Sequence, residues 1–383
     1  MKLQDNILEY LGGITMKKVQ EIINKFGNKY KKELQATEHQ SPYHLEGDVW
    51  THTMMVTNEV LKENPDDYIM LYTSLLHDIG KPEAKAKKKN GGIHFGGHPG
   101  ISTLKALDFL LNEDLEDDEI IKILYLINYH DHLMQKRKPS FWDNYFSSPF
   151  TNDLLSNLIQ FNYYDKKGSI SVIKQQINYP SVDVYKSDFY NADSQITVLI
   201  GPPGSGKSTY LSKYLQTDTD IVVISRDKMM VEILSEKYGT NDYNKIWQNA
   251  TKEEHQMITN LLMKNFSKAV KQGKQIVIDM TNVSIKSRRK WQVGKVGVKY
   301  IVFLTSLDEL QQRVAERKEQ KIKNWVLMNF VKWFEMPLPT EGNIVDVNFV
   351  IFDKKEGIKE FSLKELIQKE KFLNSNLLPQ QEK

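Results

Sequence analysis

The motif GPPGSGKST at residues 201–209 constrains this chain more than any other feature. It fits the pattern G-x-x-x-x-G-K-[ST] and directly follows the apolar run ITVLI at 196–200, which predicts a strand. Its glycines let the backbone bend so that successive N–H groups converge on phosphate oxygens at the start of a helix. The motif therefore predicts a phosphate-binding loop that joins a strand to a helix beginning near Lys207.

This loop also predicts a cofactor. We expect Lys207 to reach the β- and γ-phosphates and Ser208 to ligate Mg²⁺, so that this half of the chain uses Mg²⁺ with ATP or another nucleoside triphosphate. The residues expected to bind the nucleotide are Gly201, Gly204, Ser205, Gly206, Lys207, Ser208 and Thr209.

Further apolar runs follow the loop, namely IVVIS, QIVIDM and KYIVFL, and polar segments of helical period separate them. Strands that alternate with helices favour a parallel sheet with crossover helices, so we expect an α/β unit over residues 195–383. Residues 1–180 predict an all-α unit, because apolar residues recur there at helical spacing. The stretch 181–194 contains Asp and Ser without helical period and is expected to link the two units.

Asp227 lies just beyond the second predicted strand, and Asp279 lies just beyond the third. Ligands of open α/β sheets bind at this edge, outside the carboxyl ends of the strands. Asp227 can accept the proton of an attacking hydroxyl as a general base, or it can cap a helix that starts at Lys228; the sequence leaves both roles open. Asp279 is a candidate for substrate binding at the same edge.

Arg313 and Arg317 are four residues apart in LDELQQRVAER at 307–317, which predicts a helix with both arginines on one face. Two guanidinium groups on a common face suit the clamping of a transferring phosphoryl group. An ordinary solvated helix face is equally compatible with this pattern.

Together these segments, with SRDK, IDMTN, SRRKW and FEMPLPTEG, resemble the kinase domain of the 5′-hydroxyl polynucleotide kinase family over residues 195–345. The resemblance implies that Asp227 is the general base and that Arg317, with Arg313 one turn earlier, contacts the donor phosphates. Met230 stands where this family usually has an arginine that contacts the phosphate of the acceptor. The residues expected to replace that arginine are Arg226, Lys228, Arg288 and Arg289.

Histidines mark the first half of the chain, in the segments EGDVWTHT, SLLHDIGKP, HFGGHPG and LINYHDH, followed by an aspartate in FNYYDKKG. This order resembles the HD phosphohydrolase superfamily over residues 44–168. The resemblance implies a first metal position formed by His52, His77, Asp78 and Asp165, and a second that includes His98 and His130. Nearby residues that fit the pattern less well are His44, His94, Asp131 and His132.

The residue types agree with such a centre. The chain has no cysteine, so a metal must be held by His and carboxylate, which suit one or two divalent transition-metal ions. His77 and Asp78 would point about 100° apart on a helix and can reach one metal only where that helix ends; Gly80 and Pro82 predict such an ending. Lys81, four residues beyond His77, is expected to meet the phosphate of the substrate.

The order of the two units is similar to that of the HD-Pnk type of bifunctional end-healing enzyme. This resemblance implies that the HD domain hydrolyses a 3′-phosphate or 2′,3′-cyclic phosphate and that the kinase domain phosphorylates a 5′-hydroxyl. The expected partners are RNA or DNA ends, a nucleoside triphosphate and a separate ligase. The net charge of +3 is too small for attraction over the whole surface, so a nucleic acid would have to be held at local sites.

Two other readings remain open at this point. In one, a nucleoside or sugar kinase is fused to a nucleotidase, and Met230 favours this reading. In the other, the HD domain is a non-catalytic sensor that regulates the kinase, although the full set of predicted ligands speaks against it. Asp5 and Glu9 interrupt any apolar run near the start of the sequence, so we expect a cytoplasmic protein without a membrane anchor.

Overall fold

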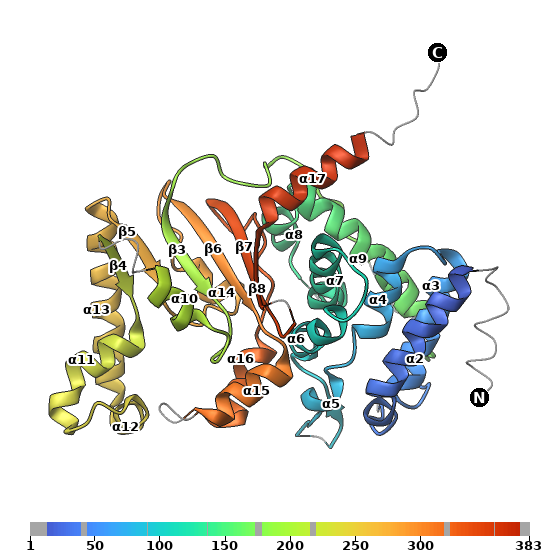
Figure 1. Ribbon diagram of the computed structural model, residues 1–383, viewed down its shortest axis with the longest axis horizontal. Coiled ribbons are helices and arrows are strands. Elements are labelled where there is room, and N and C mark those ends of the chain that lie inside the picture. Colours follow the sequence, from blue (N-terminus) through green and yellow to red (C-terminus); the bar gives the residue numbers. More distant parts are fainter. Residues whose placement is uncertain are drawn as a thin grey trace, which may run out of the picture. The chain divides into compact units, whose positions relative to one another are not determined.

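The computed structural model describes residues 14–39, 44–89, 91–135, 137–172, 178–214, 220–317, 322–355 and 357–375 (Figure 1). The chain divides into two compact units, Met1–Tyr185 with Val331–Met336, and Lys186–Phe330 with Pro337–Lys383. Asp5 and Glu9 lie outside the described residues. Among the helices of the described ranges, none is long and apolar enough to cross a bilayer.

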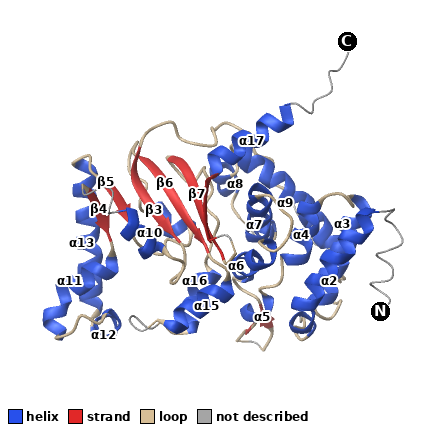
Figure 2. Ribbon diagram, in the orientation of Figure 1, coloured by secondary structure: helices blue, strands red, loops and turns tan. Residues whose placement is uncertain are grey.

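The first unit is helical, as the spacing of its apolar residues predicts (Figure 2). It adds one short antiparallel pair of strands, which the sequence analysis did not predict. Its elements are α2 (Ile14–Gln35), α3 (Val49–Glu63), α4 (Tyr68–Leu76), α5 (Lys81–Ala84), β1 (Ala86–Lys87), β2 (Ile93–His94), α6 (His98–Leu110), α7 (Asp117–Tyr129), the 3-10 helix η1 (His130–Leu133), α8 (Pro139–Tyr145) and α9 (Pro149–Lys167).

Helix α4 is the central element of this unit, and all of its residues from Met70 to Leu76 are buried. The helix ends at Leu76, so the two residues that follow, His77 and Asp78, lie in the turn before α5. This ending agrees with the one that Gly80 and Pro82 predict. Gly80 also permits a close approach to α6, because a Cβ atom there would lie 2.6 Å from the backbone nitrogen of Ser102.

A short segment from the second half of the sequence, Val331–Met336, belongs to the first unit. The side chain of Asn128 on α7 holds the second half of this segment: Nδ2 donates to the carbonyl of Phe334 at 3.0 Å, and Oδ1 accepts from the backbone N–H of Met336 at 2.9 Å. The hydroxyl of Tyr129 donates to the carbonyl of Met336 at 2.6 Å. The division between the units therefore does not follow the order of the chain.

The second unit contains a six-stranded sheet in the order β4-β5-β3-β6-β7-β8, in which the last strand alone is antiparallel to its neighbour. The predicted strands occur where the apolar runs indicate, with α/β alternation (Figures 1 and 2). Its elements are β3 (Ser194–Ile200), α10 (Lys207–Tyr214), β4 (Ile221–Ile224), α11 (Arg226–Tyr238), α12 (Tyr243–Asn249), α13 (Lys252–Lys271), β5 (Gln275–Ile278), α14 (Ile285–Arg289), β6 (Gly297–Leu304), α15 (Leu307–Glu316), α16 (Asn324–Lys332), β7 (Ile344–Asp353), β8 (Gly357–Ser362) and α17 (Leu363–Ser375).

The predicted phosphate-binding loop joins β3 to α10, which begins at Lys207 as expected. Gly204 and Gly206 have φ angles of 89° and 99°, a region that residues with a Cβ rarely adopt. Beneath the loop, apolar side chains of β3, β5, β6 and α10 form a buried cluster that includes Leu199 and Leu211. This packing holds the loop at the carboxyl edge of the parallel strands, where Asp227 and Asp279 also lie.

Candidate functional site

A cavity of about 1620 Å³ opens at the carboxyl edge of the sheet in the second unit. It is bounded by the phosphate-binding loop, the ends of β4 and β5, and the helices α12, α15 and α16. The predicted site residues that line it are Gly204, Ser205, Gly206, Lys207, Ser208, Thr209, Arg226, Asp227, Lys228, Asp279, Arg313 and Arg317. Gly201 is buried beneath the loop, where a Cβ would lie 2.5 Å from Oγ of Ser205.

The ammonium of Lys207 lies inside the loop. Its Nζ donates to the carbonyl oxygens of Gly201 at 2.7 Å and Pro202 at 2.9 Å. Burial lowers the pKa of Lys207 to about 8, an effect that the carboxylate of Asp279 opposes and the guanidinium of Arg317 reinforces. Phosphate oxygens would restore the stabilisation that the buried ammonium lacks, so the site favours an anionic ligand.

Asp227 lies in the first turn of α11, and the residue that precedes this helix is Ser225. The helix-capping alternative for Asp227 is therefore wrong, because the helix begins one residue before the carboxylate rather than after it. Burial raises the pKa of Asp227; a hydrogen bond from the Tyr243 hydroxyl opposes the rise, and the nearby carboxylate of Asp279 adds to it. A carboxylate with a raised pKa at the cavity wall is suited to accept a proton.

The two predicted arginines do not share a helical face. Helix α15 ends at Glu316, and Arg317 follows it with φ and ψ of −60° and 122°, outside the helix. Both side chains nevertheless line the cavity. Arg313 donates from Nε to Glu309 at 2.7 Å and from Nη1 to the carbonyl of Gly204 at 3.3 Å, and its guanidinium lies 4.0 Å from the ring centroid of Phe352.

Arg288 and Arg289 do not line the cavity. Arg288 is fully buried and forms a bidentate pair with Glu341, with Nε and Nη2 each 2.7 Å from a carboxylate oxygen. Its Nη1 donates to the carbonyl of Asn282 at 3.2 Å. Arg289 is exposed on the neighbouring position of α14. Arg288 thus stabilises the fold. The predicted contact between Arg288 and an acceptor would require this side chain to line the cavity, which it does not.

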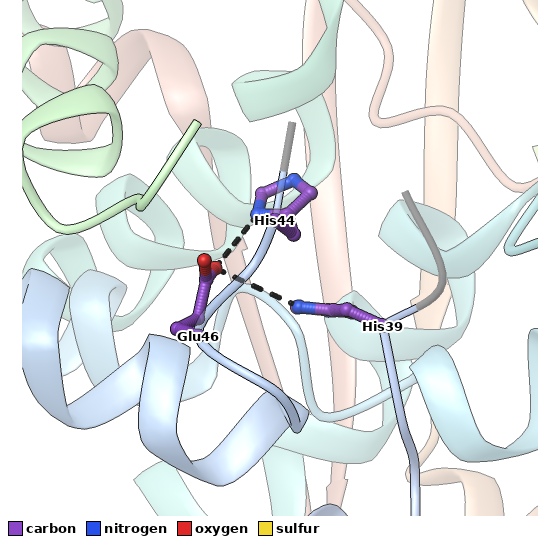
Figure 3. A group of neighbouring side chains, drawn as sticks. All are labelled: His39, His44 and Glu46. Atoms are coloured by element: carbon purple, nitrogen blue, oxygen red, sulfur yellow. Dashed lines mark hydrogen bonds and ion pairs between the residues drawn. The ribbon is translucent and has the colours of Figure 1, made fainter. Parts of the chain in front are cut away.

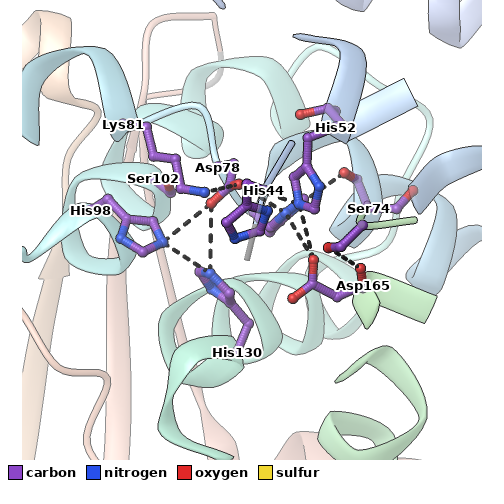
Figure 4. A network of polar contacts seen from close by, with 12 residues as sticks. His44, His52, Ser74, Asp78, Lys81, His98, Ser102, His130 and Asp165 are labelled. Atoms are coloured by element: carbon purple, nitrogen blue, oxygen red, sulfur yellow. Dashed lines mark hydrogen bonds and ion pairs between the residues drawn. The ribbon is translucent and has the colours of Figure 1, made fainter. Parts of the chain in front are cut away.

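In the first unit, the predicted histidines and aspartates converge on one buried centre (Figure 4). The Nδ1 atoms of His77, His98 and His130 lie 2.7–2.9 Å from backbone carbonyl oxygens three residues earlier in the chain. A donating Nδ1–H leaves the lone pair of Nε2 to face the centre, which is the arrangement of metal-ligating histidines. Burial, together with the nearby His98, lowers the pKa of His130 to about 4, so this ring is neutral at pH 7.

Asp78 lies between two groups of ligand atoms. Its Oδ2 is 3.2 Å from Nε2 of His77 and 3.7 Å from Nε2 of His52, which is itself 3.0 Å from Oδ1 of Asp165. Its Oδ1 is 3.2 Å from Nε2 of His98 and 3.8 Å from Nε2 of His130. This carboxylate can therefore bridge two cations, with the first and second predicted positions on its two oxygens.

These residues fit divalent ions for a further reason. Among the described residues, buried atoms of His77, Asp78 and Asp165 at the centre have no hydrogen-bond partner of acceptable geometry, although they lie 3–4 Å apart. In addition, Nε2 of His98 and Nε2 of His130 lie 3.1 Å apart while both Nδ1 atoms face carbonyl oxygens. Two Nε2 atoms at this distance can share a proton or be ligands of one metal ion, and a metal ion lets both rings keep Nδ1–H on their carbonyl oxygens.

Glu46 is not among the predicted ligands, and His44 lies outside the predicted ligand set. Oε1 of Glu46 lies 2.9 Å from Nδ1 of His52. The same oxygen lies 2.9 Å from Nδ1 of His44 and 3.7 Å from Nδ1 of His39, two contacts that Figure 3 shows. Lys81, expected at a substrate phosphate, instead pairs with Asp78 at 2.5 Å and His39 Nε2 at 3.1 Å. Glu46 belongs to the segment EGDVWTH, which also contains His52. The spacing between Glu46 and His52 matches no helical period, so the sequence gives no sign that the two side chains meet.

The second unit combines a mostly parallel α/β sheet with a phosphate-binding loop that opens on a cavity. Residues 196–337 of this unit match the AAA domain family. A protein of Autographa californica nuclear polyhedrosis virus, provisionally named a bifunctional polynucleotide kinase/RNA ligase, is 34% identical over 140 residues, which cover 34% of this chain. The chain spans only 18% of the length of that relative.

Solved structures also show similarity. A chain in the structure of the Pnkp1/Rnl/Hen1 RNA repair complex is 20% identical, with a TM-score of 0.30, over 37% of this chain and 45% of its own. A chain of the PezAT chromosomal toxin-antitoxin system of Streptococcus pneumoniae is 14% identical, with a TM-score of 0.27, over 48% of this chain and 78% of its own.

Proposed function

We propose that this chain heals broken nucleic-acid ends with two activities. The second unit transfers the γ-phosphate of ATP or another nucleoside triphosphate to the 5′-hydroxyl end of RNA or DNA. The first unit is an HD-type phosphohydrolase that removes a 3′-phosphate or a 2′,3′-cyclic phosphate. The observation that carries the proposal is that one chain holds a cavity at a phosphate-binding loop and, in its other unit, a buried cluster of His and Asp side chains that could hold metal ions. The name of the viral relative of residues in the second unit supports it.

In the kinase reaction, the carboxylate of Asp227 accepts the proton of the 5′-hydroxyl. The oxygen of that hydroxyl forms a bond to the γ-phosphorus, while the bond from the γ-phosphorus to the β,γ-bridging oxygen breaks and the nucleoside diphosphate leaves. Lys207 and Arg317 neutralise the negative charge that grows on the phosphate oxygens. Ser208 is the side chain that would hold Mg²⁺, which supplies further charge neutralisation when it is bound.

For the phosphohydrolase reaction, the residues that would hold one divalent ion are His52, His77 and Asp165, and those that would hold a second are His98 and His130. Asp78 would offer a carboxylate oxygen to each of these two groups. Such ions supply a water of lowered pKa and draw charge from phosphate oxygens when they are bound. The carbonyl contacts of the Nδ1 atoms leave the Nε2 lone pairs of His77, His98 and His130 free for a metal. His52 differs, because its Nδ1 faces the carboxylate of Glu46. Burial alone would raise the pKa of Asp78, but His77 and Lys81 hold it well below its usual range.

An oligonucleotide with a 5′-hydroxyl and a 3′-phosphate tests both activities in one tube. Incubated with the protein, ATP and a divalent ion, it should gain a 5′-phosphate and lose the 3′-phosphate, each scored by mobility and label. These ends are the substrates of a separate ligase, which we propose as the functional partner. Phosphorylation of free nucleosides in preference to oligonucleotides would support the metabolite-kinase reading instead, and absence of 3′-phosphate release with every divalent ion would support a regulatory HD unit.

A further inference from the structure

Met230, which stands where the resemblance leads one to expect an acceptor-binding arginine, is a core residue. Its side chain is fully buried and packs with Leu234, Ile246 and Ile258, which join α11, α12 and α13. The position therefore offers no group to an acceptor. Any acceptor that brings its hydroxyl to Asp227 must be held by other side chains of the cavity wall beside that carboxylate.

Helix α12 supplies such a wall. Ile246 is part of the buried core, and Tyr243 packs against the same core while it also lines the cavity. Trp247, four residues after Tyr243, lines the cavity as well. Their ring centroids lie 6.1 Å apart. Tyr243 forms the hydrogen bond to Asp227, so the same face of α12 contacts the general base and presents an aromatic surface next to it. In Figure 1, α11, α12 and α13 lie together at one end of the sheet.

Trp247 is held in place and yet open to the cavity. The guanidinium of Arg226 lies 4.8 Å from its ring centroid, and the ring of His255 on α13 lies 4.5 Å away. Arg226 is itself held, because Nη2 is 3.1 Å from Nδ1 of His255 and Nη1 is 3.2 Å from Sδ of Met230. Despite these contacts, 45% of the Trp247 surface is exposed. A fixed, exposed indole in a ligand cavity is an unused stacking surface.

We propose that Trp247 is the stacking platform for the nucleobase at the 5′ end of the acceptor strand, with Arg226 as the cationic group beside it. This inference rests on the proposed 5′-kinase function and names how that site holds its acceptor. A base that stacks on Trp247 lies near Tyr243, whose hydroxyl forms a hydrogen bond with Asp227. Stacking uses the face of the base rather than its edge, so the platform accepts all four bases.

A paired set of proteins and acceptors tests this platform. The proteins are the wild type, Trp247→Ala, Trp247→Phe and, as a control, Trp333→Ala, which removes an exposed indole that does not line the cavity. The acceptors are two oligonucleotides with a 5′-hydroxyl, one with a normal first nucleotide and one with an abasic first nucleotide. The KM for each acceptor, the KM for ATP and kcat are measured, and thermal unfolding confirms that each variant is folded.

Trp247→Ala should raise the KM for the normal acceptor about 10- to 100-fold, with the KM for ATP unchanged, and Trp247→Phe should recover most of the loss. With the wild type, the KM for the abasic acceptor should exceed the KM for the normal acceptor by a similar factor. Trp247→Ala should raise the KM for the abasic acceptor little further, because the abasic site and the substitution each remove the same stacking contact. Equal KM values of the wild type and Trp247→Ala for the normal acceptor would contradict the stacking role of Trp247. So would KM effects of the substitution and of the abasic nucleotide that multiply when they are combined. Either result would leave the proposed kinase function intact. A wild type that phosphorylates neither oligonucleotide would overturn the proposed function itself.

Discussion

The Nδ1 atom of His52 lies 2.9 Å from Oε1 of Glu46. Figure 4 labels His52, and Figure 3 shows Glu46 with His39 and His44. The contact fixes the ring of His52 so that Nε2 faces Asp165 at 3.0 Å. Oε2 of Glu46 accepts the backbone N–H of Ile170 at 3.1 Å, so both oxygens of this carboxylate are engaged. Burial alone would raise the pKa of Glu46, but hydrogen bonds from His39, His44 and His52 hold it below its usual range.

The first prediction concerns this carboxylate. Glu46→Gln keeps the shape of the side chain but removes its charge, so His52 loses the group that orients it. We expect the affinity of the first unit for divalent ions to fall about 10- to 100-fold, measured by chelator competition and by metal content after dialysis. Glu63→Gln, at an exposed glutamate paired with Lys167, is the matched control and should leave the affinity unchanged. Equal metal retention in both variants would contradict the role of Glu46.

The second prediction separates the two centres. Asp78→Asn removes the carboxylate that lies between the two groups of ligand atoms, so we expect both bound metal and release of 3′-phosphate to be lost. Phosphorylation of a 5′-hydroxyl should continue at the wild-type rate, because none of the residues that line the kinase cavity belongs to the first unit. Simultaneous loss of both activities in a folded Asp78→Asn protein would argue against independent centres.

The third prediction is the pH dependence of the kinase. Asp227 accepts a proton only when it is ionised, and its pKa is raised by burial, so the fall of kcat/KM in acid should occur above the ordinary aspartate range near about 4. Lys207 must be charged to hold phosphates, and its pKa is lowered to about 8, so kcat/KM for ATP should fall again above that pH. Asp227→Asn should lower kcat by about 10²- to 10⁴-fold and abolish the acid limb. A value of kcat/KM for ATP that stays constant as the pH rises well above about 8 would contradict the role of Lys207.

The fourth prediction distinguishes the two arginines of the cavity. Arg317 has no helix to hold it and is close enough to Asp227 for the carboxylate to influence its pKa, so we expect it to act on the transferring phosphoryl group. Arg317→Ala should lower kcat by about 10³-fold or more. Arg313 instead contacts the loop carbonyl of Gly204, so Arg313→Ala should mainly raise the KM for ATP, by about 10-fold. Steady-state kinetics with varied ATP would show the reverse pattern if the roles were exchanged.

The fifth prediction concerns the stability of the second unit. Arg288→Met leaves Glu341 as an unpaired buried charge, which costs about 3–5 kcal/mol and lowers the unfolding temperature by about 6–20 °C. Arg289→Met, at the neighbouring exposed position, should change the free energy of unfolding by less than about 0.5 kcal/mol. A stable Arg288→Met protein with a raised KM for the acceptor would restore the substrate-binding role that the sequence predicts for Arg288.

Much of the fold follows from short-range patterns. The runs that become β3, β4, β5 and β6 are apolar and bounded by polar segments, and the loop of glycines identifies the phosphate site without any tertiary information. The order of the histidine motifs also predicts which residues form the buried cluster, and the structure brings these residues within a few ångströms of one another. The small β1–β2 pair could not be predicted in this way, because two-residue strands carry too few residues to show a period.

Residues whose chemistry depends on local spacing can be predicted from the chain alone: the glycines and lysine of the loop, the aspartate after β4, and the histidines of the helical unit. The pairing of polar groups that lie far apart in the chain depends on the tertiary fold. Arg288 and Glu341 are 53 residues apart, and the carboxylate of Glu46 gathers imidazoles from different segments. Burial decides these roles, because an arginine is a substrate contact in a cavity and a structural ion pair in the core. The residues next to Arg288 and Trp247 in the sequence do not indicate whether the fold places these side chains in the core or in the cavity.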